Sequence, residues 1–150
     1  MENPLVIRSM QTGFVLLDRI LEVDARKIVG EKTFHGASAY LGIEALAQLG
    51  AYHVRFLNDF RKHAFLLKIQ SCTIPTGSTI RGSYRLFGEL RAGSAHSYAH
   101  HLEARRDDLV VWGGDFLFST VAYDHRFKKD LLQTHYGKIF SCLRSDMKTG

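Results

Sequence analysis

The sequence predicts an α+β fold in which one antiparallel sheet bends around a single long helix. This prediction depends on the spacing of the apolar residues, which changes twice between residues 14 and 123. Apolar residues follow a strand pattern over 14–33, a helical pattern over 39–58, and a strand pattern again over 64–123. The helical stretch is rich in small residues, so a sheet can wrap closely around it.

The first two strands are expected on either side of a short turn. Residues 14–23 are rich in Val, Leu and Ile, which favours a strand, and residues 24–26 form the turn. Residues 27–33 alternate between apolar and polar side chains and return beside the first strand. Asp18 and Arg19 are expected to form a structural ion pair.

Residues 39–58 predict the buried helix. Ser38 stands directly before it and is expected to supply the N-cap side chain. Gly50 lies in the helix interior, where glycine costs about 1 kcal/mol relative to alanine. We expect close packing of the sheet on this side of the helix to offset that cost.

The remainder predicts four more antiparallel strands, over 64–74, 78–90, 95–105 and 109–123, separated by turn sequences. Trp112, Phe116 and Phe118 are expected in the core or at a dimer interface. Apolar residues return to helical spacing near the C-terminus. We therefore expect a single domain over residues 1–150, with a core at about 14–123 and a C-terminal helical extension at about 126–144.

The composition is that of a soluble globular domain, with 45% hydrophobic and 23% charged residues. No apolar run approaches the roughly 20 residues of a membrane span, and the N-terminus has no signal-peptide pattern. The two cysteines, Cys72 and Cys142, match no metal-ligand spacing. We expect a cytoplasmic protein that uses no metal or other cofactor.

Basic residues exceed acidic ones, 20 to 15, for a net charge of +5. They are scattered and form no nucleic-acid motif, so no nucleic-acid partner is expected. The densest clusters predict either a solvated face or a landing site for an acidic carrier protein. They comprise Arg55, Arg61 and Lys62, and then Arg126, Lys128 and Lys129.

Two separated motifs resemble those of the 3-hydroxyacyl-[acyl carrier protein] dehydratases. Residues 16–24, LLDRILEVD, are similar to the first-strand signature of that family, and residues 42–48, GIEALAQ, to the start of its central helix. Residues 65–67, FLL, fall where the family begins the next strand. The resemblance is closest to the subgroup of aryl polyene and related specialised lipid synthesis. It implies a hotdog fold that acts on acyl thioesters.

The resemblance also implies roles for particular residues. His35 matches the base that takes a proton from the carbon next to the thioester carbonyl, and Glu44 matches the acid that protonates the departing hydroxyl. The helix N-terminus would polarise the carbonyl oxygen. Gly36, Ser38 and Gln48 are expected to contact substrate, with Gln48 orienting Glu44 or capping the pocket. The reaction expected is dehydration of 3-hydroxyacyl thioesters to trans-2-enoyl thioesters.

The short connection over residues 36–41 leaves two alternatives open. It resembles that of hotdog thioesterases, in which Glu44 would activate water or attack directly and the Gly36 N–H would hold the oxyanion. The third possibility is an acyl-binding or scaffold subunit without activity. The LLDR and ALAQ sequences favour the dehydratase.

Hotdog domains of this family work as dimers with an active site between subunits, so a homodimer or higher homo-oligomer is expected, with acyl carrier protein as the partner that delivers the substrate. His96, His100 and His101 raise the question of a metal site. On one strand His96 and His100 share a face and His101 points away. No metal is therefore assigned to them.

Overall fold

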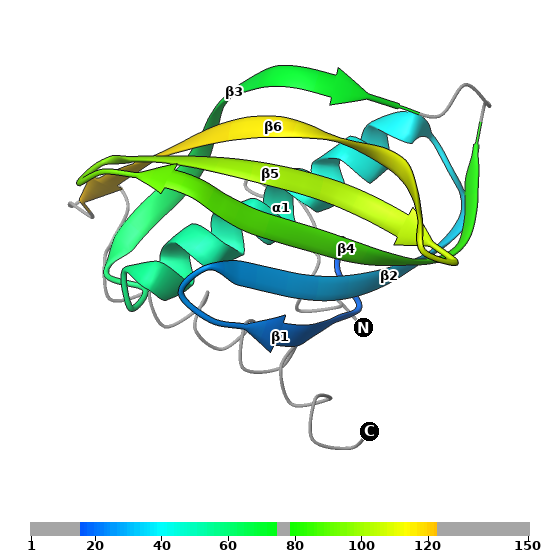
Figure 1. Cartoon of the computed structure of the whole chain (residues 1–150), viewed down its shortest axis with the longest axis horizontal. Helices are drawn as coiled ribbons and strands as arrows, with labels where there is room; N and C mark the ends of the chain where they lie inside the picture. Colours follow the sequence, from blue (N-terminus) through cyan, green and yellow to red (C-terminus); the bar gives the residue numbers. More distant parts are fainter. Residues whose placement is uncertain (1–15, 75–78, 123–150) are drawn as a thin grey trace, which may run out of the picture.

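The computed structural model describes residues 16–74 and 79–122, which form one helix and one six-stranded sheet (Figure 1). The strands, all paired antiparallel, run in the spatial order β1-β2-β4-β5-β6-β3, and the helix α1 lies against one face of the sheet. The elements are β1 (Arg19–Val23), β2 (Lys27–Ala37), α1 (Ala39–Leu57), β3 (Lys62–Thr73), β4 (Ile80–Gly93), β5 (Ser97–Arg106) and β6 (Leu109–Ala122).

The order of the strands places β1 and β3 at the two edges. The chain leaves β2, forms α1, and then crosses to the far edge as β3, which pairs only with β6. β4 returns to pair with β2, so the start of the helix and the start of β4 lie at the same end of the sheet. The predicted sheet around one helix is confirmed.

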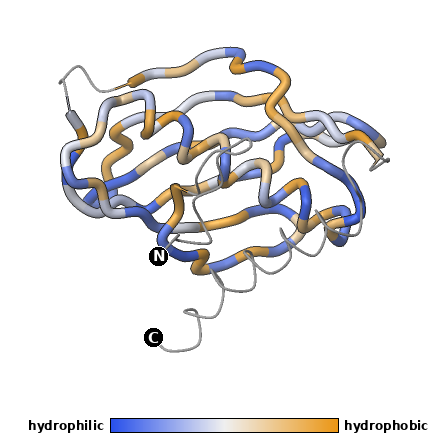
Figure 2. The backbone as a smooth tube through the Cα atoms, turned by 180° about the vertical axis from the view of Figure 1, so that it is seen from behind, coloured by the Kyte–Doolittle hydropathy of each residue, from blue (hydrophilic) through white to orange (hydrophobic). Residues whose placement is uncertain are grey.

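The core lies between α1 and the inner face of the sheet. Along the strands, apolar and polar residues alternate, as Figure 2 shows in the changing colours of the tube. On β6 the even-numbered side chains point inward, and Trp112, Phe116 and Phe118 are fully buried there. Their expected place in the core is confirmed. Leu46 and Leu49 face them from the helix.

Gly50 lies on the side of the helix that packs against the sheet. A Cβ atom on it would overlap the ring of Phe118 and would come within 3.1 Å of Leu102. The expectation that close packing explains a mid-helix glycine is therefore confirmed.

Several local predictions were wrong. β2 does not end at Thr33 but continues to Ala37, so His35 lies within a strand. Asp18 and Arg19 do not pair with each other, because each reaches across to β2. The Asp18 carboxylate accepts the Thr33 N–H at 2.7 Å and pairs with Lys32 at 3.3 Å, while Arg19 lies 3.4 Å from Glu31.

The first basic cluster is also not the exposed patch that was expected. Arg55 is buried, and its guanidinium donates to the carbonyl of Ala64, which ties the end of α1 to β3. The C-terminal helix, the second basic cluster and Cys142 lie outside the described residues.

Candidate functional site

The chain passes from β2 into α1 through a bulge centred on Gly36. The pairing of β2 with β4 slips between His35 and Ala37, and Gly36 has φ +91°, a conformation that side chains other than glycine rarely adopt. Ser38 then occupies the N-cap position, as predicted, but its side chain makes no capping hydrogen bond. The first turn of α1 therefore has amide groups that the Ser38 side chain does not cap.

His35 lies on the outer face of the sheet at this junction. Its neighbour Phe34 is buried and packs against Tyr84 and Trp112, so His35, one position along the strand, points away from the helix and is exposed. Directly opposite on β4 is Arg81. The Arg81 guanidinium covers Gly36, with Nη2 only 3.1 Å from the place that a Cβ would occupy.

Glu44 and Gln48 lie one turn apart on α1. Glu44 is exposed, whereas Gln48 is half-buried, and its Oε1 accepts the N–H of Leu16 at 2.6 Å. Gln48 thus holds the chain segment that leads into β1. Whether it also orients Glu44 or contacts substrate stays a prediction.

Within one chain the structure does not bring His35 and Glu44 together. His35 points from the outer face of the sheet, while Glu44 stands on the helix that covers the inner face. Neither side chain has a hydrogen bond or ion pair with any described residue. Gly36 and Ser38 lie between them along the chain and form the connection into the helix.

Beneath the first turns of α1 lies an aromatic cluster that the sequence did not connect with the site. Trp112 Nε1–H donates to the carbonyl of Gly42 at 2.9 Å, and its ring is 4.8 Å from that of Tyr84. Tyr84 in turn donates to the carbonyl of Arg81 at 3.0 Å. This cluster fixes the helix N-terminus relative to the β4 segment opposite His35. The link between this cluster and His35 follows from the register of β4 beside β2, which no local sequence pattern shows.

The opposite end of α1 holds a buried histidine pair. His53 Nδ1 lies 2.9 Å from His100 Nε2, and His53 Nε2 lies 2.7 Å from the carbonyl oxygen of Asp24. A carbonyl can only accept, so His53 Nε2 carries the proton and Nδ1 accepts from His100. Burial lowers the pKa of both rings, that of His100 to about 3.

His101 points to the outer face, away from His100, as the alternation predicted. Its ring nitrogens contact Asp115 at 2.9 Å and Glu103 at 3.0 Å. Partial burial lowers the pKa of His101, but the hydrogen bonds to these two carboxylates outweigh it and raise the pKa. Within the described ranges, 16–74 and 79–122, no three potential ligand side chains converge on a metal site.

No protein-family model and no curated protein sequence matches this chain. Solved structures do share its fold. The dehydratase heterocomplex ApeI:P from Xenorhabdus doucetiae gives a TM-score of 0.64 at 14% identity, covering 88% of this chain and 92% of that one. This chain is a hotdog-fold protein.

Two thioesterases show the same likeness. One from Pseudomonas aeruginosa has a TM-score of 0.60 at 9% identity over 70% of this chain and 81% of its own. One from Haemophilus influenzae has 0.59 at 9% identity, over 71% and 80%. At identities this low, the structural similarity establishes the hotdog fold alone, and the reaction has to be argued from the residues.

No helix in the described part of the chain is long and apolar enough to cross a membrane.

Proposed function

We propose that this hotdog protein acts on acyl thioesters at the junction of β2 and α1, and that it dehydrates 3-hydroxyacyl thioesters delivered by acyl carrier protein. One observation carries the proposal: an exposed histidine, a positive-φ glycine bulge and a helix N-terminus without a side-chain cap follow one another over residues 35–38. Glu44 lies exposed a little more than one turn into the same helix.

The chemistry follows from these groups. The His35 imidazole takes a proton from the carbon next to the thioester carbonyl. The electron pair forms the carbon–carbon double bond, and the 3-hydroxyl group leaves as water with a proton from Glu44. Negative charge that develops on the carbonyl oxygen is stabilised by the free amides at the start of α1 and by their aligned dipoles.

A second subunit is part of this proposal, because one chain keeps His35 and Glu44 apart. The edge strand β3 is open to a partner: Phe65, Leu66, Leu67 and Ile69 are 36–53% exposed although consecutive residues point to opposite faces. Apolar and polar residues share β3, the uppermost strand in Figure 2, and the apolar ones gather over residues 64–69. A long edge strand that exposes apolar side chains favours pairing with another chain.

We propose a homodimer in which two β3 strands pair and each active site combines His35 of one copy with Glu44 of the other. The fold of this chain is also found in a dehydratase heterocomplex, so a related hotdog chain is the competing partner. The specific pathway proposed is synthesis of aryl polyene or related lipids, on the resemblance of the motifs at 16–24 and 42–48.

The thioesterase reaction remains a second candidate, favoured by the bulge itself. Gly36 follows His35 directly, and Glu44 is only eight positions after Gly36. In that reaction Glu44 activates water or attacks the carbonyl carbon, and the Gly36 N–H holds the oxyanion.

Mass spectrometry of a 3-hydroxyacyl thioester on acyl carrier protein separates the candidates. Loss of one water with the thioester intact supports the dehydratase, provided that Glu44→Gln and His35→Ala abolish it. Free acid whose release depends on Glu44 identifies a thioesterase. An unchanged thioester that still binds saturably contradicts both enzymes and favours the acyl-binding subunit.

A further inference from the structure

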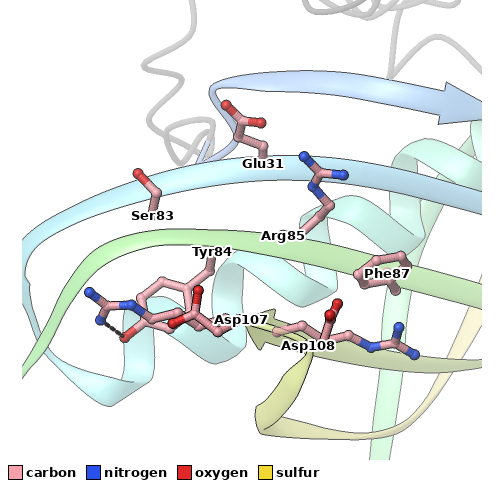
Figure 3. A pocket seen from close by; sticks show the side chains of 9 residues that line it. Glu31, Ser83, Tyr84, Arg85, Phe87, Asp107 and Asp108 are labelled. Atoms are coloured by element: carbon pink, nitrogen blue, oxygen red, sulfur yellow. Dashed lines mark hydrogen bonds between the residues drawn. The ribbon is translucent and has the colours of Figure 1, made fainter.

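The outer face of the sheet, the face on which His35 lies, has a trough that the reaction does not explain. It has a volume of about 710 Å³ and lies over β4, β5 and the β5–β6 turn. We call it the arginine trough after Arg85, Arg105 and Arg106, which line it together with Ser83 and Phe87 (Figure 3).

Two of these arginines form an arrangement that is unfavourable without a ligand. Arg85 on β4 and Arg105 on β5 are directly opposite each other in the strand register. Like charges at such positions destabilise a sheet. Arg105 turns away, because it pairs with Glu103 and places its guanidinium 4.1 Å from the centre of the Phe87 ring.

Arg85 has no such compensation. Its side chain is exposed and forms no hydrogen bond or ion pair with any described residue. The residue opposite it on β2 is Glu31, which pairs with Arg19 at 3.4 Å instead. Figure 3 shows Arg85 and Glu31 rising from the same face of the sheet. The trough therefore presents an uncommitted guanidinium, the group that best matches a phosphate.

The third arginine fixes the wall nearest the junction. Arg106 Nη1 donates to the carbonyl of Arg81 at 3.0 Å and to the Tyr84 hydroxyl at 3.3 Å, and its guanidinium lies over Gly82, which has φ +100°. A side chain on Gly82 would displace it. The wall of the trough is thus joined to the β4 segment opposite His35.

A continuous outward-facing row leads from the trough to the candidate base. Along β4 it consists of Arg85, Ser83 and Arg81, and the last of these is paired with His35. Four residues of strand span about 13 Å. Like Arg85, Arg81 makes no side-chain hydrogen bond or ion pair with a described residue. The row therefore connects two uncommitted guanidinium groups along the way to His35.

We propose that the arginine trough binds the phosphate of a phosphopantetheine arm, with Arg85 as the main contact, and that the arm then follows this row to His35. The inference rests on the proposed function, since it takes the substrate to be a thioester on such an arm. Arms of this kind occur on carrier proteins, joined by a phosphodiester, and in coenzyme A.

The acidic residues of the trough favour the carrier protein as the source. Glu31, Asp107 and Asp108 line the same hollow. These carboxylates repel a ligand with several negative charges. The single charge of a phosphodiester therefore suits the trough better than the several charges of coenzyme A.

Calorimetric titration of the full chain with 4′-phosphopantetheine and with pantetheine, which lacks the phosphate, tests the proposal. We expect the phosphate to tighten binding about tenfold, the effect of one charge-assisted hydrogen bond. Arg85→Gln should abolish that difference, and Arg61→Gln, a matched exposed arginine beyond the far end of α1, should preserve it. Because the Arg85 side chain is exposed and forms no hydrogen bond or ion pair with a described residue, the variant should melt at the wild-type temperature.

Equal binding of the two compounds by the wild type would overturn the proposal, as would equal losses in the two variants. Titration with phosphopantetheinylated carrier protein and with coenzyme A identifies the source. Tighter binding of coenzyme A would overturn the assignment to the carrier. These are binding results, so they stay informative if no dehydration product is found, and their failure leaves a measured dehydration intact.

Discussion

The two ends of α1 use the same residue types in opposite ways. At the N-terminal end, His35 and Arg81 are exposed and neither side chain bonds to a described residue. At the C-terminal end, His53 is fully buried between His100 and the Asp24 carbonyl, and Arg55 donates to Ala64. The same residue type can therefore stabilise the fold where its side chain bonds to other residues, or be available to a substrate where its side chain has no such bonds.

The largest effect expected from this contrast is on rate at the N-terminal end. His35→Ala should slow dehydration by about 10²–10⁴-fold, the usual contribution of a general base. The melting temperature should not change, because the side chain is exposed and forms no hydrogen bond or ion pair with a described residue. Steady-state kinetics and calorimetry measure the two quantities. His96→Ala, another exposed histidine, is the control and should alter neither.

At the other end the effect should be on stability alone. His53→Ala removes two hydrogen bonds and leaves the Asp24 carbonyl and His100 Nε2 without their partner. Buried polar groups left in this state destabilise a protein by about 2–4 kcal/mol in total. Chemical denaturation measures the change. A large loss of activity per folded molecule in this variant would contradict a purely structural role for the C-terminal end of α1.

The middle of the helix should respond through packing. Gly50→Ala adds a methyl group where the Phe118 ring already lies, so we expect a loss of about 1–3 kcal/mol despite the better helix propensity of alanine. Adding Phe118→Leu should make room, so that the double variant is more stable than the two single losses predict. Strict additivity in denaturation would show that the two residues do not compete for space.

Acid should weaken the C-terminal end gradually. The folded-state pKa values of His53 and His100 are lowered, so the unfolded chain binds more protons below its histidine pKa of about 6.5. Stability is then full above pH 6.5 and falls as the pH drops toward about 3, the pKa of His100. His63, with a pKa of about 4, contributes in the same direction.

The measurement for this prediction is the free energy of unfolding as a function of pH. His100→Gln should flatten the curve by up to about 1.4 kcal/mol per pH unit, the limit for one proton. The slope that remains belongs to the other groups with shifted pKa values, which include His53 and His63 and the carboxyl groups of Asp24, Glu103 and Asp115. An unchanged slope would mean that His100 does not titrate differently in the folded and unfolded chain.

The sequence predicted the fold well because spacing of apolar residues reports directly which face of an element is buried. The helix over 39–57 and the strands around it follow from that spacing. It could not show that Arg55 is buried, since an arginine on the helix reaches a β3 carbonyl only after the chain has folded back.

The candidate site was predictable only in part, for a related reason. His35 and Glu44 came from similarity of local motifs, which need no knowledge of pairing. Arg81 and Arg85 matter because β4 lies beside β2 in one particular register, and Arg81 is 46 positions after His35 in the sequence. Register depends on the whole sheet, so no local pattern pointed to these arginines.

The central claim is that His35 and Glu44 of different subunits form one active site. Co-expression of differently tagged His35→Ala and Glu44→Gln chains, followed by purification of the mixed dimer, tests it most directly. Each mixed dimer has two active sites, of which one contains both wild-type residues and the other contains both substituted residues. We predict dehydration at about half the wild-type rate per dimer from this mixture, and none from either variant alone. A mixed dimer that forms but remains inactive would contradict the claim.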